Sequence, residues 1–185
     1  MKPWVKLAAA AAVVAIGLLL WFQLRQHETV SDVDLVGLLD EAEKRSTLPA
    51  DEAIAVVDQD IEGDVRRGIY AHPPSRIIWK LLVPRDAWLR TSLGIKPEAW
   101  ELEGDGVLFR IGVSDGRTYE ELLSQHLHPS INPGDRRWVP VNIDLSAYSG
   151  EFVELIFNTN TSPPNQGDDG RNDWAIWGTP LIRAQ

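Results

Sequence analysis

Apolar and polar residues alternate along most of the chain after residue 65, with the period of β-strands that turn one face toward a core. Seven segments are predicted as strands on this basis: 77–83, 88–93, 107–113, 119–127, 139–145, 153–157 and 174–182. Turn sequences rich in Gly, Asn, Asp and Pro separate them, and no helix long enough for a crossover connection is predicted between them. We therefore expect an all-β fold over residues 65–185, an antiparallel jelly-roll β-sandwich.

The first 25 residues follow another pattern, with an uninterrupted apolar run from Leu7 to Phe22. As a helix, the 21 residues of Trp4–Leu24 would be about 31 Å long, which is enough to span a bilayer. The basic residues Lys2 and Lys6 favour a cytoplasmic N-terminus. A cleaved signal peptide is the alternative, but no small-x-small cleavage site follows the run. We expect residues 1–25 to be an uncleaved transmembrane signal anchor.

Residues 26–64 are strongly acidic, with twelve acids against two bases. Ser31 can cap a helix with apolar residues over 33–39, and the short apolar run 53–57 fits either a strand or a further helical turn. The segment is predicted to be an acidic stalk, partly helical, that acts as a solvated spacer. A docking surface for a basic partner is the alternative. With the anchor, this organisation predicts a single-pass protein of the bacterial inner membrane with a periplasmic domain.

Composition excludes several classes of function. The net charge of −9 and the lack of a Lys/Arg cluster argue against nucleic acid as a partner. Without cysteine there are no disulfides, thiolate metal sites or thiol nucleophiles. The chain has no Gly-x-Ser-x-Gly turn and no His-Glu-x-x-His helix. The adjacent Glu120 and Glu121 would point to opposite faces of a strand, so they could not act as a catalytic pair on one glycosidic bond. We expect no enzymatic activity. The alternative is a catalytic zinc site at His126 and His128, completed by His72 or an acid.

Tryptophan and arginine supply the candidate ligand-binding residues. Trp138 at a strand start, beside Arg136 and Arg137, would form a platform for a glycan or an anionic group. The alternative is that the two arginines pair with loop acids such as Asp105 or Asp173 and hold loops together. A second pair, Trp174 and Trp177, would point to opposite strand faces, which favours packing in the core or at its rim over sugar stacking.

An acidic loop near the C-terminus offers oxygen ligands. Asp168, Asp169 and Asp173, with Asn172, are the hard ligands that calcium prefers, although their spacing is not that of an EF-hand. The glycines of this loop explain a turn without any ion. We expect no cofactor, with a structural calcium at these three aspartates as the alternative.

Five segments occur in an order that resembles a known superfamily: Tyr70–Ser75, Asp105–Phe109, Asp135–Trp138, Ile143–Gly150 and Asp173–Pro180. Over residues 68–182 the chain is similar to galactose-binding-like modules, which occur in extracytoplasmic parts of bacterial membrane proteins such as sulfatases and glycosyltransferases. It also resembles carbohydrate-binding modules of secreted glycosidases. The resemblance implies a non-catalytic module that recognises carbohydrate or a polysaccharide-handling partner. A structural module that binds a neighbouring membrane protein, with no sugar affinity, remains the alternative.

Overall fold

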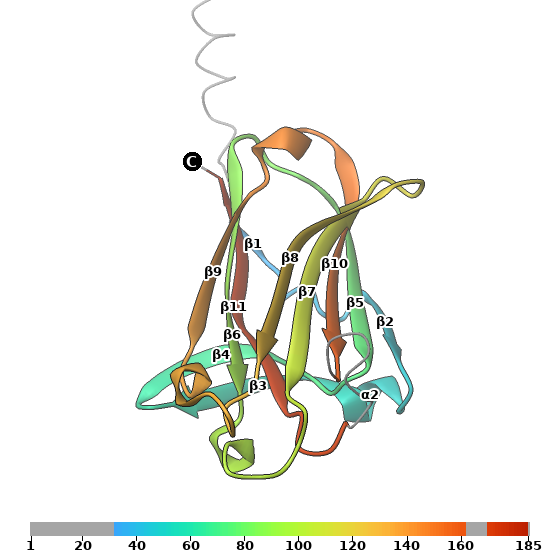
Figure 1. Ribbon diagram of the computed structural model, residues 1–185. Helices are drawn as coiled ribbons and strands as arrows, with labels where there is room; N and C mark the ends of the chain where they lie inside the picture. Colours follow the sequence, from blue (N-terminus) through green and yellow to red (C-terminus); the bar gives the residue numbers. More distant parts are fainter. Residues whose placement is uncertain (1–31, 162–169, 185) are drawn as a thin grey trace, which may run out of the picture. The chain divides into compact units, whose positions relative to one another are not determined.

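Eleven strands form the framework of the part that the structure, a computed structural model, describes, namely residues 32–161 and 170–184 (Figure 1). They are β1 (Val33–Asp34), β2 (Glu43–Ser46), β3 (Ile54–Ile61), β4 (Asp64–Ala71), β5 (Ser75–Leu82), β6 (Ala87–Ile95), β7 (Val107–Ser114), β8 (Tyr119–Leu127), β9 (Val139–Asp144), β10 (Phe152–Asn160) and β11 (Ala175–Ala184). The short helix α2 (Ala50–Ala53) and the 3-10 turns η1 (Pro97–Ala99), η2 (Pro133–Asp135) and η3 (Ser146–Tyr148) connect them.

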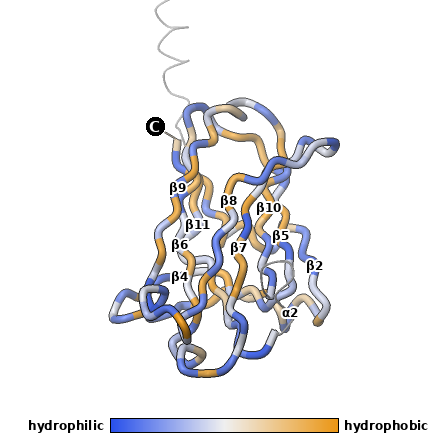
Figure 2. Tube along the Cα trace, viewed as in Figure 1, coloured by the Kyte–Doolittle hydropathy of each residue, from blue (hydrophilic) through white to orange (hydrophobic). Residues whose placement is uncertain are grey.

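The strands form two antiparallel sheets that pack face to face. Sheet A has the order β3-β4-β11-β6-β9, and β1 also pairs with β11, beyond the residues that pair with β4. Sheet B has the order β2-β5-β10-β7-β8. Hydrophobic and hydrophilic residues alternate along many of these strands (Figure 2), as expected where one face of a strand is buried and the other is solvated. The antiparallel two-sheet sandwich predicted from the sequence is confirmed, and β5 to β11 correspond to the seven predicted strands.

Aromatic side chains join the two sheets at the centre of the core. Trp177 of sheet A lies with its ring centroid 4.5 Å from that of Phe157 and 4.9 Å from that of Phe109, both in sheet B. Trp79 meets Phe157 edge-on at 5.0 Å. Such tilted and edge-to-face contacts add to the stabilisation from burying these large rings. The buried Trp177 side chain donates a hydrogen bond from Nε1 to Thr159 Oγ1, so its one polar atom is satisfied.

Residues 32–64 belong to the sandwich, which corrects the expected stalk. Strand β3 pairs with β4 along its whole length, and β2 pairs with the edge of β5. Leu35 and Leu39, assigned from their spacing to a helix, are buried in the main core within a turn that follows β1. The helical assignment failed because the apolar spacing of this segment also fits a buried turn, and its partner strands come from distant parts of the sequence.

The expected anchor, residues 1–25, lies outside the described residues, as do residues 26–31 of the expected stalk. Within the described ranges, no helix is both long and apolar enough to cross a membrane. The described chain begins beside the C-terminal strand, where the Asp32 carboxylate lies 3.2 Å from Nε of Arg183.

Candidate functional site

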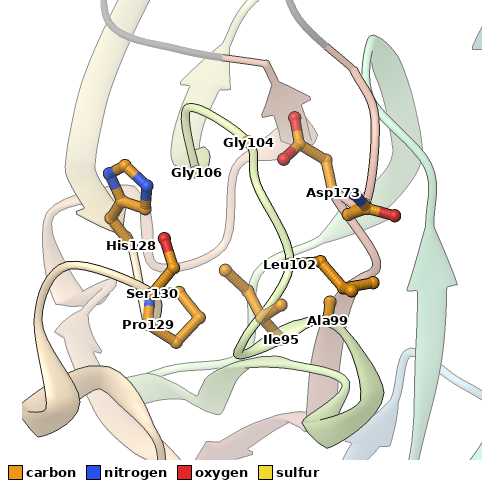
Figure 3. A pocket seen from close by; sticks show the side chains of 10 residues that line it. Ile95, Ala99, Leu102, Gly104, Gly106, His128, Pro129, Ser130 and Asp173 are labelled. Carbon is orange, nitrogen blue, oxygen red and sulfur yellow. The ribbon is translucent and has the colours of Figure 1, made fainter.

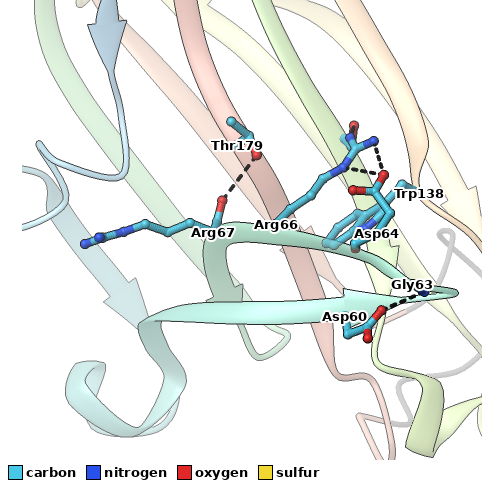
Figure 4. A network of polar contacts seen from close by, with 8 residues as sticks. Asp60, Gly63, Asp64, Arg66, Arg67, Trp138 and Thr179 are labelled. Carbon is cyan, nitrogen blue, oxygen red and sulfur yellow. Dashed lines mark hydrogen bonds and ion pairs between the residues drawn. The ribbon is translucent and has the colours of Figure 1, made fainter.

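Trp138 is buried, which corrects the expectation of an exposed platform (Figure 4). Its side chain is 7% exposed and packs against Ile61 and Ile176 in a small apolar cluster of sheet A. The indole Nε1 donates to the backbone carbonyl of Asp64 at 2.9 Å. The guanidinium group of Arg66, which also binds the Asp64 carboxylate, lies 5.3 Å from the ring centroid. With its ring covered on the outside by Arg66, Trp138 cannot offer a stacking surface to a sugar.

Two strand glycines make room for this ring. A Cβ atom at Gly94 or Gly178 would lie 2.8 Å from Cζ3 of Trp138, closer than real Cβ contacts come. The indole therefore lies directly on the backbone of β6 and β11. Glycine in the interior of a strand often marks such a close approach, and this was the one sequence signal for a buried Trp138.

The two arginines of the predicted platform stabilise the loop between β8 and β9. Arg136 donates from Nε to the carbonyl of Pro129 at 2.9 Å, and its Nη1 lies 2.6 Å from Oε1 of Glu101. Arg137 donates from Nε to the carbonyl of Gly134 at 3.0 Å. The alternative that these arginines hold loops together fits Arg136, although its acidic partner is Glu101 instead of Asp105 or Asp173. Trp174 packs partly buried against the main core.

A small pocket lies at this loop end of the sandwich (Figure 3). Asp173 and His128 are among its lining residues, together with Ile95 and Gly104. Its volume of about 10 Å³ is about that of one water molecule, so it cannot hold a sugar ring.

The two metal sites that the sequence left as alternatives involve residues of this loop end. Asp168 and Asp169 lie outside the described residues, so the calcium site stays a prediction. Within residues 32–161 and 170–184, no three His, Cys, Asp or Glu side chains form a group that could hold a metal ion. His126 instead makes a hydrogen bond through Nε2 to the carbonyl of Asp105 at 2.9 Å.

The outer face of sheet B carries a row of polar side chains across its strands. The strand register places Arg45 beside Arg76, Arg76 beside Asn158, and Asn158 beside Arg110. We call these four residues, one each from β2, β5, β10 and β7, the arginine row. Because neighbouring strands are only about 4.8 Å apart, four segments distant in the sequence present their polar groups side by side.

Beside the arginine row, the same face has an apolar floor and an aromatic ring. Ile78 and Ile156 point outward, away from the main core, yet are only 4% and 6% exposed because the longer side chains around them cover them. The ring of Tyr119 lies over Gly112, where there is no space for a Cβ atom, and is 42% exposed. Apolar contacts and a partly exposed ring thus lie next to planar hydrogen-bonding groups.

These residues line a groove with room for a ligand. One hollow of about 420 Å³ is lined by the arginine row, Tyr119 and the two isoleucines. A second hollow of about 290 Å³ shares Arg45, Arg76 and Asn158 with the first and extends toward Asn160. We call the two together the sheet-B groove. Its volume lies in the range of roughly 300–1,000 Å³ typical of small-ligand sites, unlike that of the pocket at the loop end.

Polar contacts orient the side chains of the groove. Arg76 donates from Nε to Oδ1 of Asn158 at 2.6 Å, and Asn158 is itself buried. Nε of Arg110 lies 2.5 Å from Oε2 of Glu121, and Arg45 pairs with Glu43 in the same way at 2.6 Å. Partial burial raises the pKa of the Tyr119 hydroxyl, while the positive charges of Arg110 and Arg76 act in the opposite direction. The phenol is therefore neutral near pH 7 and can both donate and accept a hydrogen bond.

This groove was not predicted from the sequence. The outward positions of Arg76 and Asn158 could be read from the alternation along their strands, but the order of strands in the sheet could not. Arg45 lies in the segment assigned to the stalk, and this removed one member of the arginine row from consideration.

Comparison of the sequence with known proteins gives one relative and no family. No protein-family model matches the chain. An uncharacterized protein of Archaeoglobus fulgidus is 36% identical over 129 residues, which are 66% of this chain and 32% of that protein. The chain thus spans about a third of the length of this relative.

Solved carbohydrate-binding modules share the same architecture at low sequence identity. CBM51 from Clostridium perfringens GH95, in complex with methyl-galactose, matches with a TM-score of 0.51 and 17% identity over 82% of this chain and 99% of the module. TmCBM61, in complex with beta-1,4-galactotriose, matches with a TM-score of 0.52 and 10% identity over 80% of this chain and 90% of the module. The described part of this chain therefore has the galactose-binding-like β-sandwich fold of carbohydrate-binding modules.

Proposed function

We propose that this protein is a membrane-anchored, extracytoplasmic and non-catalytic module that binds carbohydrate in the sheet-B groove. The observation that carries the proposal is the groove itself, in which Tyr119 and an apolar floor lie beside the arginine row. A sugar ring has apolar C–H faces and a rim of hydroxyls, so it needs both kinds of contact. The fold shared with carbohydrate-binding modules supports the proposal, but the site is argued from this chain's own residues.

Tyr119→Ala should weaken carbohydrate binding about tenfold. The stacking of a nucleic-acid base on an aromatic side chain, a contact comparable to that of a sugar ring on Tyr119, contributes about 1–3 kcal/mol per base. The melting temperature should change little, since the ring lies on the outer face of the sheet. Binding of the full-length protein to a panel of neutral and charged polysaccharides by affinity electrophoresis, beside a thermal melt, checks this.

Phe152→Ala is the matched control for Tyr119→Ala. Phe152 is an exposed aromatic residue of sheet B that does not line the groove, so its loss should leave binding unchanged. Full retention of binding by Tyr119→Ala would contradict the proposed site. Absence of binding to every polysaccharide of the panel by the unaltered protein would contradict the proposed function.

The membrane anchor is the second component of the proposal, and the apolar stretch Trp4–Leu24 supports it. The full-length protein should stay with the membrane after alkaline carbonate washing, and protease added on the outer side of the inner membrane should remove the domain. Immunoblotting of the washed membranes measures both. A soluble product that begins near Glu28 would show cleavage instead of anchoring.

A structural module that binds a neighbouring membrane protein is the second candidate function. It is favoured by one observation, an apolar pair of opposed residues in sheet B: Leu82 and Phe152 are 60% and 68% exposed. If this pair contacts a protein partner, Leu82→Ser should abolish co-purification of that partner after cross-linking, while Tyr119→Ala should not. The opposite pattern would favour the sheet-B groove as the functional surface.

A further inference from the structure

We infer that the carbohydrate bound in the sheet-B groove is anionic, with carboxylate or sulfate groups, and that Arg76 binds one of these groups. The inference rests on the proposed function and names the chemical class of its ligand. Two observations and one physical argument carry it: the hydrogen bonding of Arg76, the row of cations that includes it, and the cost of removing water from these cations when a ligand binds.

Arg76 is oriented by a neutral partner and has no acidic one among the described residues. Its Nε donates to Oδ1 of Asn158, a buried amide oxygen, and this contact fixes the plane of the guanidinium group. Among the ion pairs between described residues, none includes Arg76. The side chain is exposed and lines both hollows of the groove. Its terminal nitrogens can thus form the bidentate contact that guanidinium makes with a carboxylate or sulfate.

The neighbours of Arg76 increase the positive charge in the groove. Arg45 lies on the adjacent strand and Arg110 two strands away on the other side, so the three guanidinium-bearing positions span about 15 Å across the sheet. Arg45 and Arg110 each have a glutamate partner, but ion pairs at such exposed positions contribute only about 0.2–1 kcal/mol and can rearrange around a ligand. Glu154, the acid that lines the groove, lies 3.4 Å from Nζ of Lys80.

A neutral glycan would explain this arrangement less well. A ligand in the groove removes water from the guanidinium groups, and burying a cation without an anion is costly. A carboxylate or sulfate on the ligand offsets that cost, whereas hydroxyl groups offset only part of it. The chain as a whole carries a net charge of −9 and repels polyanions at long range, so binding of an anionic polymer requires a local cationic site.

Two pairs of polymers, each with the same backbone with and without anionic groups, test the inference with the full-length protein. Polygalacturonate and its methyl ester test for carboxylate, and dextran sulfate and dextran test for sulfate. We expect at least one charged polymer to bind ten or more times tighter than its neutral partner, with an affinity that falls as NaCl is raised. Arg76→Gln should weaken that binding about tenfold without changing the melting temperature, and Arg76→Lys should recover only part of it.

Arg117→Gln is the control for general charge effects, because Arg117 is exposed and lies outside the groove. Equal affinity for charged and neutral partners, or an equal loss of binding in Arg117→Gln and Arg76→Gln, would overturn the inference and leave carbohydrate binding in place. Failure to bind any of the four polymers would also overturn it. The proposed function would be overturned as well only if the unaltered protein bound no polysaccharide of the wider panel that is used to test Tyr119→Ala.

Discussion

A fragment of residues 32–185 is expected to unfold in one cooperative transition, whereas a fragment of residues 65–185 is expected to have no stable fold. The shorter fragment lacks β3, which pairs with β4 along eight residues, and the buried side chains of Leu35 and Leu39. Burial of one such side chain contributes about 1.5–3 kcal/mol. Five of them are removed: Leu35, Val36, Leu39, Ile54 and Ile61. Their loss, about 8–15 kcal/mol, is as large as the whole stability of a typical domain, about 5–15 kcal/mol.

Thermal melts followed by far-ultraviolet circular dichroism and tryptophan fluorescence compare the two fragments. Leu35→Ala in the longer fragment is an intermediate case and should lower the free energy of unfolding by about 2–5 kcal/mol. A reducing agent should not change any of these melts, since the chain has no cysteine. A cooperative melt of the 65–185 fragment at the temperature of the longer one would show that residues 32–64 are dispensable for the sandwich.

Trp138→Ala is expected to lower the free energy of unfolding by about 3–5 kcal/mol, the usual cost of removing a buried tryptophan. The change leaves a cavity over Gly94 and Gly178 and removes the hydrogen bond to the Asp64 carbonyl. It also leaves Arg66 without the ring that it covers. Equilibrium unfolding in urea measures the loss.

Trp138→Phe separates the two contributions, because it fills most of the cavity but cannot donate to Asp64. It should cost less than Trp138→Ala, with about 0.5–1.5 kcal/mol for the lost hydrogen bond to the carbonyl of the exposed Asp64. Carbohydrate binding by the folded fraction of either variant should be unchanged, since Trp138 does not line the sheet-B groove. Unchanged stability together with lost binding would instead restore the exposed platform expected from the sequence.

The strands from residue 75 onward could be predicted because their signal is local. Alternation with a period of two residues, interrupted by turns, requires only neighbouring residues, and it correctly located β5 to β11. The order of five short segments likewise indicated the galactose-binding-like fold. The sequence leaves Trp174 and Trp177 as candidate ligand-binding residues, although their spacing favours packing in the core or at its rim. Trp177 lies at the centre of the core and cannot bind a ligand there.

Long-range pairing decided the rest. The segments 33–34 and 43–46 are too short and too charged to indicate strands by themselves, and they form strands because β11 and β5 present unpaired edges to them. Trp138 is buried because two glycines and Arg66, all distant in the sequence, surround its ring. The arginine row exists only through the register of four strands, since no local pattern places Arg45, Arg76 and Arg110 on one line. The sequence determined that the segments from residue 75 onward are strands. Tertiary structure determined that earlier segments form strands as well, which strands are neighbours, and thus where the candidate site lies.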